Sequence, residues 1–539
     1  MFIYFHSYHP RTWDAMVSAG LIDQNAGIRF CQSKLIDNGL KFNELAAEGS
    51  RLHSLIEEKK LPLYIDRLQG GCYIDDYVYD EGLLEHYRQL LGDGFLGFQM
   101  HEWASNFYTD IAKINRDPDC DWTKESIEKA IYTQFPFLCL FLESQSSEEF
   151  AQMGPVNTAE DYYKAAIDLF ERRQKQYGAL VPCDSYAMTF KLALDRGVKD
   201  FMPEVGAQTP NIRLQISYTR SLAEAYGARF GVYYEPWGGD PFSACCYHKD
   251  GKNEWGIGES ADFPFETMGE NGGSSRSLQK RIHLYGYLSG ASYIAEEWGL
   301  CNTFVDWENF ELSEYGRVKK EFLEFVREYP NVGHKLAPIA LVLPKEFDVY
   351  NVEERQTFCT YPLDPEKQQK LDGIREQVAK VFAAPLDDMQ GTEVRNLINS
   401  HMPDAVALVH EDSAGLEKYA YLVDMTPAGK VKEKYSNTCE IDEIPGLLQK
   451  LLPCYVEGGL HWMVNKAEDG HYLAIFNHSG VMRTVADGEY ILPGTEKTVT
   501  LRINGDLALQ VLEGSATVEK IGCEYHITVP GGDWLFAKF

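Results

Sequence analysis

Along the first 300 residues, short apolar runs alternate with longer stretches in which apolar residues recur every three or four positions. The short runs are typical of strands, and the longer stretches of amphipathic helices that are long enough to connect parallel strands. This alternation predicts a parallel βα protein, either a barrel or a doubly wound sheet. The predicted strands cover residues 2–8, 27–33, 62–67, 95–102, 137–143, 179–185, 200–204, 230–235 and 292–297.

Nine predicted strands are one more than a (β/α)8 TIM barrel needs. The surplus strand is residues 137–143, because residues 124–152 also read as a helical insertion between strands four and five. The predicted helices include residues 41–60, 81–91, 160–177 and 213–226.

A helical pattern over residues 312–329 is interrupted by a Pro-Asn-Val-Gly turn at 330–333 and by Pro338, which places a domain boundary near residue 335. Residues 1–335 are therefore expected to form the barrel. Residues 336–454 predict a small α/β domain, with strand-like runs at 339–343, 405–409 and 419–423 and helices at 365–383 and 391–400. Residues 455–539 alternate apolar and polar positions between turns, which predicts a C-terminal β-sandwich.

Charge and cysteine content exclude several classes of partner. The 539 residues carry 51 Lys and Arg against 81 Asp and Glu, so the formal net charge is −30, which repels nucleic acid and anionic membranes. The 12 cysteines are scattered without Cys-x-x-Cys spacing, which favours free thiols in a reducing compartment. With neither a basic leader nor an apolar run of spanning length, the chain is expected to be cytoplasmic.

Acidic and aromatic residues gather at the ends of the predicted strands, where the βα loops of a barrel build an active site. The clearest segments are Gln99-Met-His-Glu-Trp103, residues 202–206, residues 231–239 and residues 294–299. In three of them Trp lies within two residues of Glu. Cleavage of a glycosidic bond needs a carboxylic acid at the leaving oxygen and a carboxylate at the sugar carbon, and sugars pack on aromatic faces.

The pattern therefore points to a carbohydrate site. Candidate substrate-binding residues are Asp66, Arg67, His101, Trp103, Asn106, Asp184, Tyr234, Trp237, Arg276 and Trp298. The Gly-x-Gly-x-x-Gly at 92–97 precedes a strand and does not open a helix, so a dinucleotide site is not expected. No His or Cys cluster has metal-ligand spacing, so neither a cofactor nor a catalytic metal is expected.

The whole chain resembles the three-domain clan A glycoside hydrolases, especially the family 42 β-galactosidases. The best local match runs from Leu284-Tyr-Gly-Tyr-Leu-Ser-Gly to Leu312-Ser-Glu-Tyr-Gly-Arg-Val, which looks like the family's last barrel strand and the helix behind it. The resemblance implies a catalytic barrel, a flavodoxin-like domain used for trimerisation and a β-sandwich. It also places strand eight near Ile294.

Counting from that strand, the resemblance implies that Glu235, followed by Pro236, is the nucleophile on strand seven. Counting forward, strand four ends at Glu102, which is implied as the acid/base, although His101 stands where the family has Asn. If residues 137–143 form strand four, Glu143 takes that role. If residues 230–235 form strand eight, Glu204 displaces Glu235, and Glu297 is a further alternate.

The expected function is that of a retaining exo-glycoside hydrolase that cleaves small oligosaccharides or glycosides with two glutamates. The resemblance implies a homotrimer, with a carbohydrate as the partner. Two rival hypotheses are a catalytically silent carbohydrate-binding or regulatory barrel and an enzyme that cleaves glycosides without hydrolysis. A pair of carboxyl groups at catalytic separation would favour the hydrolase.

Overall fold

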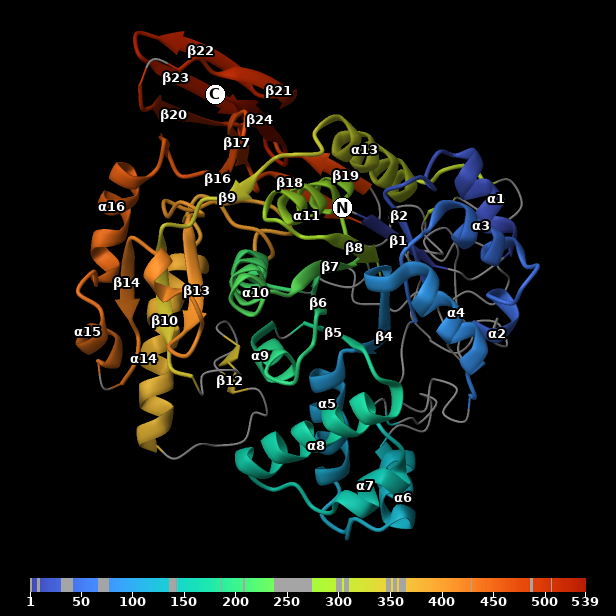
Figure 1. Ribbon diagram of the computed structural model, residues 1–539. Helices are drawn as coiled ribbons and strands as arrows, with labels where there is room; N and C mark the ends of the chain where they lie inside the picture. Colours follow the sequence, from blue (N-terminus) through green and yellow to red (C-terminus); the bar gives the residue numbers. More distant parts are fainter. Residues whose placement is uncertain are drawn as a thin grey trace.

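The computed structural model describes the chain except for residues 1, 7–9, 31–41, 66–76, 135–141, 143, 186, 207–208, 237–273, 297–302, 305–309, 346–349, 352–355, 358–364, 428, 485–487 and 506. Eight parallel strands form a closed barrel in chain order (Figure 1). They are β1 (Phe2–His6), β2 (Ala26–Phe30), β3 (Leu63–Ile65), β4 (Phe95–His101), β5 (Leu180–Asp184), β6 (Asp200–Gly206), β7 (Arg229–Glu235) and β8 (Tyr293–Glu296).

The predicted parallel barrel is confirmed, because every neighbouring pair of strands is parallel and β1 pairs with β8 through Ile3 and Ile294. Eight of the nine predicted strands match barrel strands in order. The ninth, residues 137–143, lies outside the described residues except for Leu142, and the barrel closes without it.

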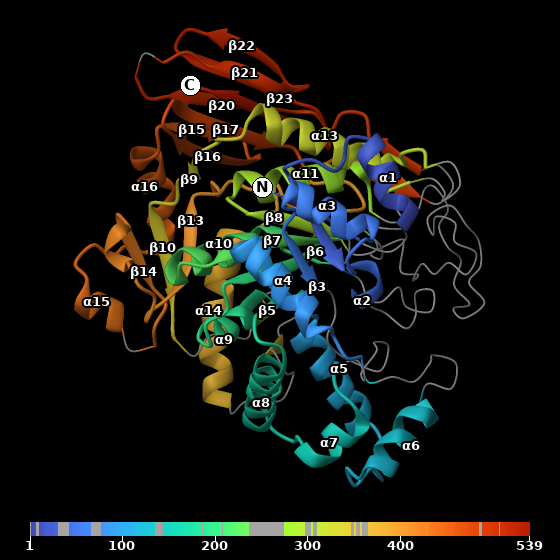
Figure 2. The same cartoon turned by 45° about the vertical axis from the view of Figure 1, so that its right-hand side comes forward.

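Helices surround the barrel, and none that the structure describes is both long and apolar enough to cross a bilayer. They are α1 (Pro10–Ser18), α2 (Phe42–Leu45), α3 (Arg51–Lys59), α4 (Glu81–Leu91), α5 (Trp103–Asn115), α6 (Lys124–Gln134), α7 (Ser147–Met153), α8 (Ala159–Tyr177), α9 (Phe190–Leu194), α10 (Ile212–Tyr226), α11 (Arg276–Leu288) and α13 (Glu314–Glu328). In Figure 2, α5 to α8 extend below the barrel.

The helix predicted over 41–60 is wrong as a single element, because it is divided into α2 and α3. Gly49 between them has a φ of 84°, a left-handed conformation that suits glycine. Ser50 then starts α3 as its N-cap, and its hydroxyl accepts a hydrogen bond from the His53 amide at 3.0 Å.

The middle of the chain contains a three-stranded parallel sheet in the order β13 (Val406–His410), β10 (Ile339–Leu343), β14 (Tyr421–Asp424). Its helices are α14 (Pro365–Phe382), α15 (Lys430–Lys434) and α16 (Ile444–Leu451), and a short antiparallel pair links β11 (Tyr350–Asn351) with β12 (Gln356–Thr357). The strands and the helix near 365–383 agree with the sequence prediction.

The helix predicted at 391–400 is wrong, since this segment consists of turns and irregular backbone. Its carbonyl groups bind another element: Arg395 and Asn396 accept hydrogen bonds from the amides of Asn211 and Ile212 at 3.0 and 2.9 Å. These amides stand at the start of α10, where a helix leaves its N–H groups without internal partners. The segment has the apolar spacing of a helix, but its carbonyl groups form hydrogen bonds with α10 in place of helical ones.

The end of the chain is built of antiparallel strands, as predicted. A four-stranded sheet has the order β15 (Cys454–Glu457), β20 (Lys497–Ile503), β23 (Glu524–Val529), β22 (Thr517–Ile521). A five-stranded sheet has the order β21 (Gln510–Gly514), β24 (Trp534–Lys538), β17 (Gly470–Phe476), β16 (His461–Ala467), β9 (His334–Lys335), and β18 (Val481–Thr484) pairs with β19 (Gly488–Ile491). Through β9, the chain joins this C-terminal sheet directly after the barrel.

The beginning of α11 is held by residues from later parts of the chain. The amide of Ser275, the N-cap, donates to the Glu393 carboxylate at 2.7 Å, and the amide of Ser277 donates to Glu489 at 3.1 Å. The Ser277 hydroxyl donates to the Gly532 carbonyl at 2.5 Å. Carboxylates bind well at this end of a helix because its free N–H groups carry partial positive charge.

Buried charges around Asp404, which precedes β13, connect a barrel helix with the C-terminal sheet. Its carboxylate lies 2.7 Å from Lys335 Nζ on β9, 3.0 Å from His461 Nε2 on β16 and 3.7 Å from Arg213 Nε on α10. Burial by itself would raise the pKa of Asp404, but Lys335 and Arg213 hold it well below its usual range. Burial lowers the pKa of Lys335 to about 8 and that of His461 to about 4.

Candidate active site

The inner face of the barrel is defined by a compact set of buried side chains. These are Tyr64, Leu96, Val181, Cys183, Met202, Tyr233, Tyr293 and Ala295. Since strand side chains alternate between faces, a residue two positions beyond an inward one also points inward. Glu204 follows Met202 and Glu235 follows Tyr233 at this spacing, so both carboxylates lie on the inner face at the carboxyl ends of β6 and β7.

Glu204 and Glu235 lie on neighbouring strands and are 2% and 3% exposed. The register pairs Glu204 with Tyr233 and Gly206 with Glu235. A Cβ atom on Gly206 would lie 1.9 Å from the Glu235 carbonyl oxygen, so glycine permits the strands to approach closely here. Glu204 Oε2 accepts a hydrogen bond from the Ser185 hydroxyl at 3.2 Å.

Glu102 lies directly after β4 in an unusual backbone conformation. Its φ of 43° and ψ of 38° are left-handed, which is uncommon for a residue other than glycine and is often found at functional sites. Asn106 Nδ2 donates to Glu102 Oε2 at 3.3 Å, and His101 Nε2 lies 3.4 Å from the same oxygen. The side chain is 32% exposed, far more than Glu204 or Glu235.

His101, Cys183 and Glu204 form a group that the sequence analysis missed. Each offers one ligand atom, these atoms lie within 4.8 Å of one another, and all three residues are buried. His, Cys and Glu are ligands of divalent transition metals. Burial and the nearby Glu204 and Asp184 carboxylates raise the pKa of the Cys183 thiol well above its usual range, so the thiol is protonated unless a cation displaces the proton.

Arg29 on β2 is a second buried group that sequence patterns did not single out, although it is a lone cation within an apolar strand. It donates to the Tyr233 hydroxyl at 2.5 Å and to the carbonyl of Glu296, and its guanidinium lies 4.7 Å from the Tyr233 ring centre. The Tyr233 and His101 rings pack edge to face, with their centres 5.2 Å apart. Arg29 therefore brings a buried positive charge beside Tyr233, on the inner face of the barrel.

Three predicted substrate-binding residues need correction because their side chains lie outside the barrel. Asp184 is fully buried, and its carboxylate accepts hydrogen bonds from the amides of Ala104 and Ser105 at 2.8 and 3.2 Å, so it binds the start of α5. Trp103 is fully buried against Phe170 and has no exposed ring face for a sugar.

The third is Tyr234, which belongs to the core between the barrel and its helices and whose hydroxyl bonds with that of Ser274. Burial raises its pKa well above the usual range. Arg276, another predicted substrate-binding residue, packs on Tyr315, with its guanidinium 3.7 Å from the ring centre.

Glu296, the first glutamate of the β8 segment, also lies outside the barrel. Lys319 Nζ approaches its carboxylate to 2.6 Å, and Gln279 donates to it at 2.8 Å. Burial would raise the pKa of Glu296, but Lys319 and His283 lower it to about 2. This carboxylate therefore stays ionised and holds α11 and α13 against the barrel.

The remaining predicted site residues lie outside the described part of the chain. They are Asp66, Arg67, Glu143, Trp237, Glu297 and Trp298. In the barrel, residues 95–101 are the fourth strand and residues 229–235 the seventh. This order agrees with the count that placed Glu102 and Glu235, and it contradicts the alternative in which residues 230–235 are strand eight.

No known family model and no curated protein matches the chain. Among solved structures, similar chains include glycoside hydrolases. The α-L-fucosidase isoenzyme 2 from Paenibacillus thiaminolyticus is 9% identical over 100% of this chain and 99% of its own, with a TM-score of 0.46. The catalytic module of a family 98 glycoside hydrolase from Streptococcus pneumoniae TIGR4 is 9% identical over 100% and 98%, with a TM-score of 0.39.

Proposed function

We propose that the chain is a retaining exo-glycoside hydrolase in which Glu235 is the nucleophile and Glu102 the acid/base. The observation that carries this proposal is the placement of both glutamates at the carboxyl ends of barrel strands, Glu235 on β7 and Glu102 directly after β4. Glycosidic cleavage with retention needs two carboxyl groups with these complementary roles.

Their surroundings support this division of roles. Glu235 is 3% exposed and so is protected from water, as suits a carboxylate that forms a covalent sugar ester. Glu102 is 32% exposed and must exchange a proton in each half of the cycle. Its Oε2 faces Asn106 and His101, while Oε1 has no partner among the described residues and is the atom we assign to the leaving oxygen.

In the first step, Glu235 attacks the anomeric carbon while Glu102 transfers its proton to the glycosidic oxygen, which leaves as an alcohol. In the second, Glu102, now ionised, takes a proton from water, and the resulting hydroxide displaces Glu235 from the sugar. Each substitution inverts the carbon, so the product keeps the configuration of the substrate.

The proposal is tested by incubating purified protein with a panel of aryl glycosides and following the product anomer by NMR. We expect turnover of at least one glycoside, release of the retained anomer first, and activity that survives removal of metals with a chelator. An inverted first product would contradict the double displacement. Loss of activity on chelation would point instead to a metal held by His101, Cys183 and Glu204.

Replacing Glu102 by Ala should weaken activity strongly on a natural disaccharide but much less on an aryl glycoside with a good leaving group. The activated substrate needs no proton from the enzyme to depart. Added azide should then restore turnover and give a glycosyl azide of retained configuration. The initial rates with and without azide are the measurement, and Glu148→Ala, at an exposed position of α7, is the control. Full activity of Glu102→Ala on the disaccharide would mean that another residue is the acid/base.

We further propose three domains, residues 1–335, 336–454 and 455–539, with the middle one a reduced flavodoxin-like domain that forms a homotrimer in the cytoplasm. The parallel order of β13, β10 and β14 supports the middle assignment. Light scattering at micromolar concentration should give three times the mass of the chain. A monomer would contradict the trimer and leave the catalytic proposal untouched.

A further inference from the structure

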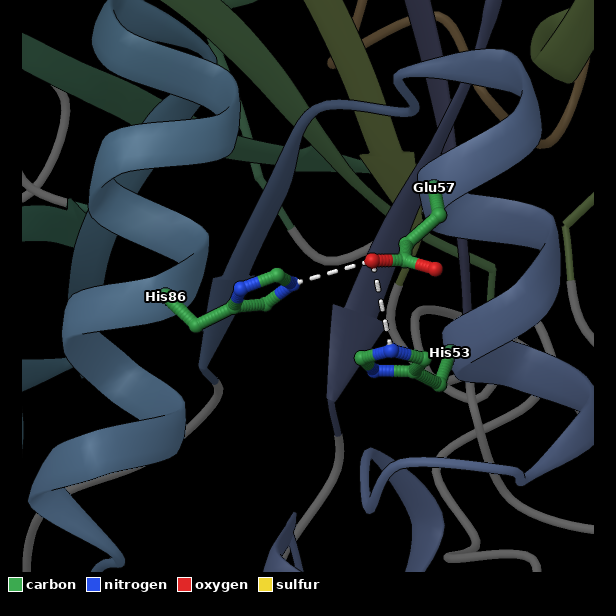
Figure 3. A group of neighbouring side chains, drawn as sticks. All are labelled: His53, Glu57 and His86. Carbon is green, nitrogen blue, oxygen red and sulfur yellow. Dashed lines mark ion pairs between the residues drawn. The ribbon is translucent and has the colours of Figure 1, made fainter.

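A histidine pair and a glutamate meet on the outside of the barrel, between α3 and α4 (Figure 3). His53 and Glu57 are one helical turn apart on α3, so they share a face of that helix. Their Nε2 and Oε1 atoms are 3.5 Å apart. His86 on α4 points its Nε2 to the same oxygen at 3.3 Å. The ligand atoms of the three residues lie within 4.8 Å of one another.

Hydrogen bonds behind the group indicate which nitrogen of His53 carries a proton. The Tyr87 hydroxyl donates its only hydrogen to the Ala46 carbonyl at 2.9 Å. His53 Nδ1 lies 2.9 Å from that hydroxyl oxygen and 3.2 Å from the same carbonyl. With that hydrogen on the carbonyl, both neighbours are acceptors for Nδ1, and this network favours the N–H on Nδ1. In the neutral ring, the lone pair is then on Nε2, directed toward Glu57.

This arrangement is the one found around metal-binding histidines, in which the other ring nitrogen donates to a carbonyl and so orients the ligand. His53 is held in this way, with its side chain only 8% exposed. His86 Nε2 is a buried atom with no hydrogen-bond partner, although its side chain is 41% exposed. The two imidazole rings are stacked, with centres 5.3 Å apart.

The three atoms that converge can all act as electron-pair donors. Because the Glu57 oxygen lies 3.5 and 3.3 Å from the two Nε2 atoms, either a proton on one of these nitrogens or a metal ion must lie among them. Two nitrogen ligands and one oxygen ligand are the alternative that a metal ion would use. This set suits zinc and related ions, whereas calcium and magnesium prefer oxygen alone.

We propose that His53 Nε2, Glu57 and His86 Nε2 bind one divalent transition-metal ion of the zinc class, with water completing the coordination. Metal bonds of about 2.0–2.2 Å require the three atoms to draw together. Glu57 and His86 can do this because both side chains are partly exposed, 46% and 41%. The ion would tie α3 to α4 on the outside of the barrel, and this proposal is independent of the proposed hydrolase activity.

The test uses the full chain, stripped with a chelator and titrated with Co²⁺ in the visible range and with Zn²⁺ by calorimetry. We expect one equivalent whose binding is weakened more than about tenfold in His86→Ala and in Glu57→Gln. His334→Ala, at an exposed histidine, and Glu58→Gln, at the exposed neighbour of Glu57, should bind as the parent does. Circular dichroism establishes that each variant is folded.

Two results would overturn the proposal. One is binding that is unchanged in His86→Ala and Glu57→Gln, which would place the metal elsewhere; a thiolate charge-transfer band would then identify the Cys183 group. The other is the absence of any bound equivalent between pH 7 and 8, which would leave a proton as the occupant. If His86→Ala proves unfolded, Glu57→Gln decides, since it keeps the size of the side chain.

Discussion

Replacing Glu235 by Ala should reduce activity by about a thousandfold or more on every substrate, including aryl glycosides with good leaving groups. Without the carboxylate no covalent intermediate can form, and a better leaving group does not replace the missing nucleophile. The measurement is kcat/KM on the best glycoside from the panel, with substrate in excess over enzyme and the variant purified free of the parent protein.

Glu204→Gln is the matched comparison, because Glu204 is equally buried on the neighbouring strand and bonds with Ser185. We expect it to weaken activity less than Glu235→Ala does, since the amide can still bind the Ser185 hydroxyl. If Glu235→Ala still turns over while Glu204→Gln is inactive, the nucleophile is Glu204 and our assignment is wrong.

The largest effect on stability is expected from Asp404→Asn. This change preserves the volume of the side chain but leaves Lys335 and Arg213 as buried cations without their counterion. Removing one partner of a buried ion pair costs about 3–5 kcal/mol, because the remaining charge has lost its water and its neighbour. Unfolding in urea, followed by tryptophan fluorescence and circular dichroism at pH 7, measures the loss.

Asp388→Asn is the control for this change. Asp388 pairs with Lys497 at 3.0 Å, but its side chain is 70% exposed. A pair of this kind contributes about 0–1 kcal/mol, so the midpoint of unfolding should hardly move. Equal effects of the two substitutions would mean that the Asp404 group is not the electrostatic centre we describe.

The barrel was predictable because its strands and helices have different hydrophobic periods, which the sequence displays locally. The face on which a strand-end residue lies was much harder to predict. A shift of one position turns a side chain to the other side of the sheet. This is why Glu235 lies inward while its neighbour Tyr234 and Asp184, the last residue of β5, lie outward. Asp184 bonds with the start of α5, and Tyr234 bonds with Ser274 just before α11. Trp103 is the first residue of α5, and its ring is buried against Phe170 of α8, a contact that the local sequence does not indicate.

Groups assembled from distant segments could not be predicted at all. His53 and His86 belong to separate helices, and nothing between them in the sequence indicates that they meet. Asp404 draws its partners from α10, β9 and β16. The helix predicted at 391–400 failed for a related reason, since its carbonyl groups serve the start of α10.

The contacts at the start of α11 bear on how the protein is made in the cell. Ser274, just before this helix, donates its amide to the carbonyl of Pro236, the residue after Glu235. The helix itself is held by Glu489 and Gly532, which are synthesised 212 and 255 residues after Ser277. A prematurely terminated chain can thus contain every barrel strand and still lack the contacts behind Glu235, the proposed nucleophile. We therefore expect the proposed activity only from chains that extend beyond residue 532.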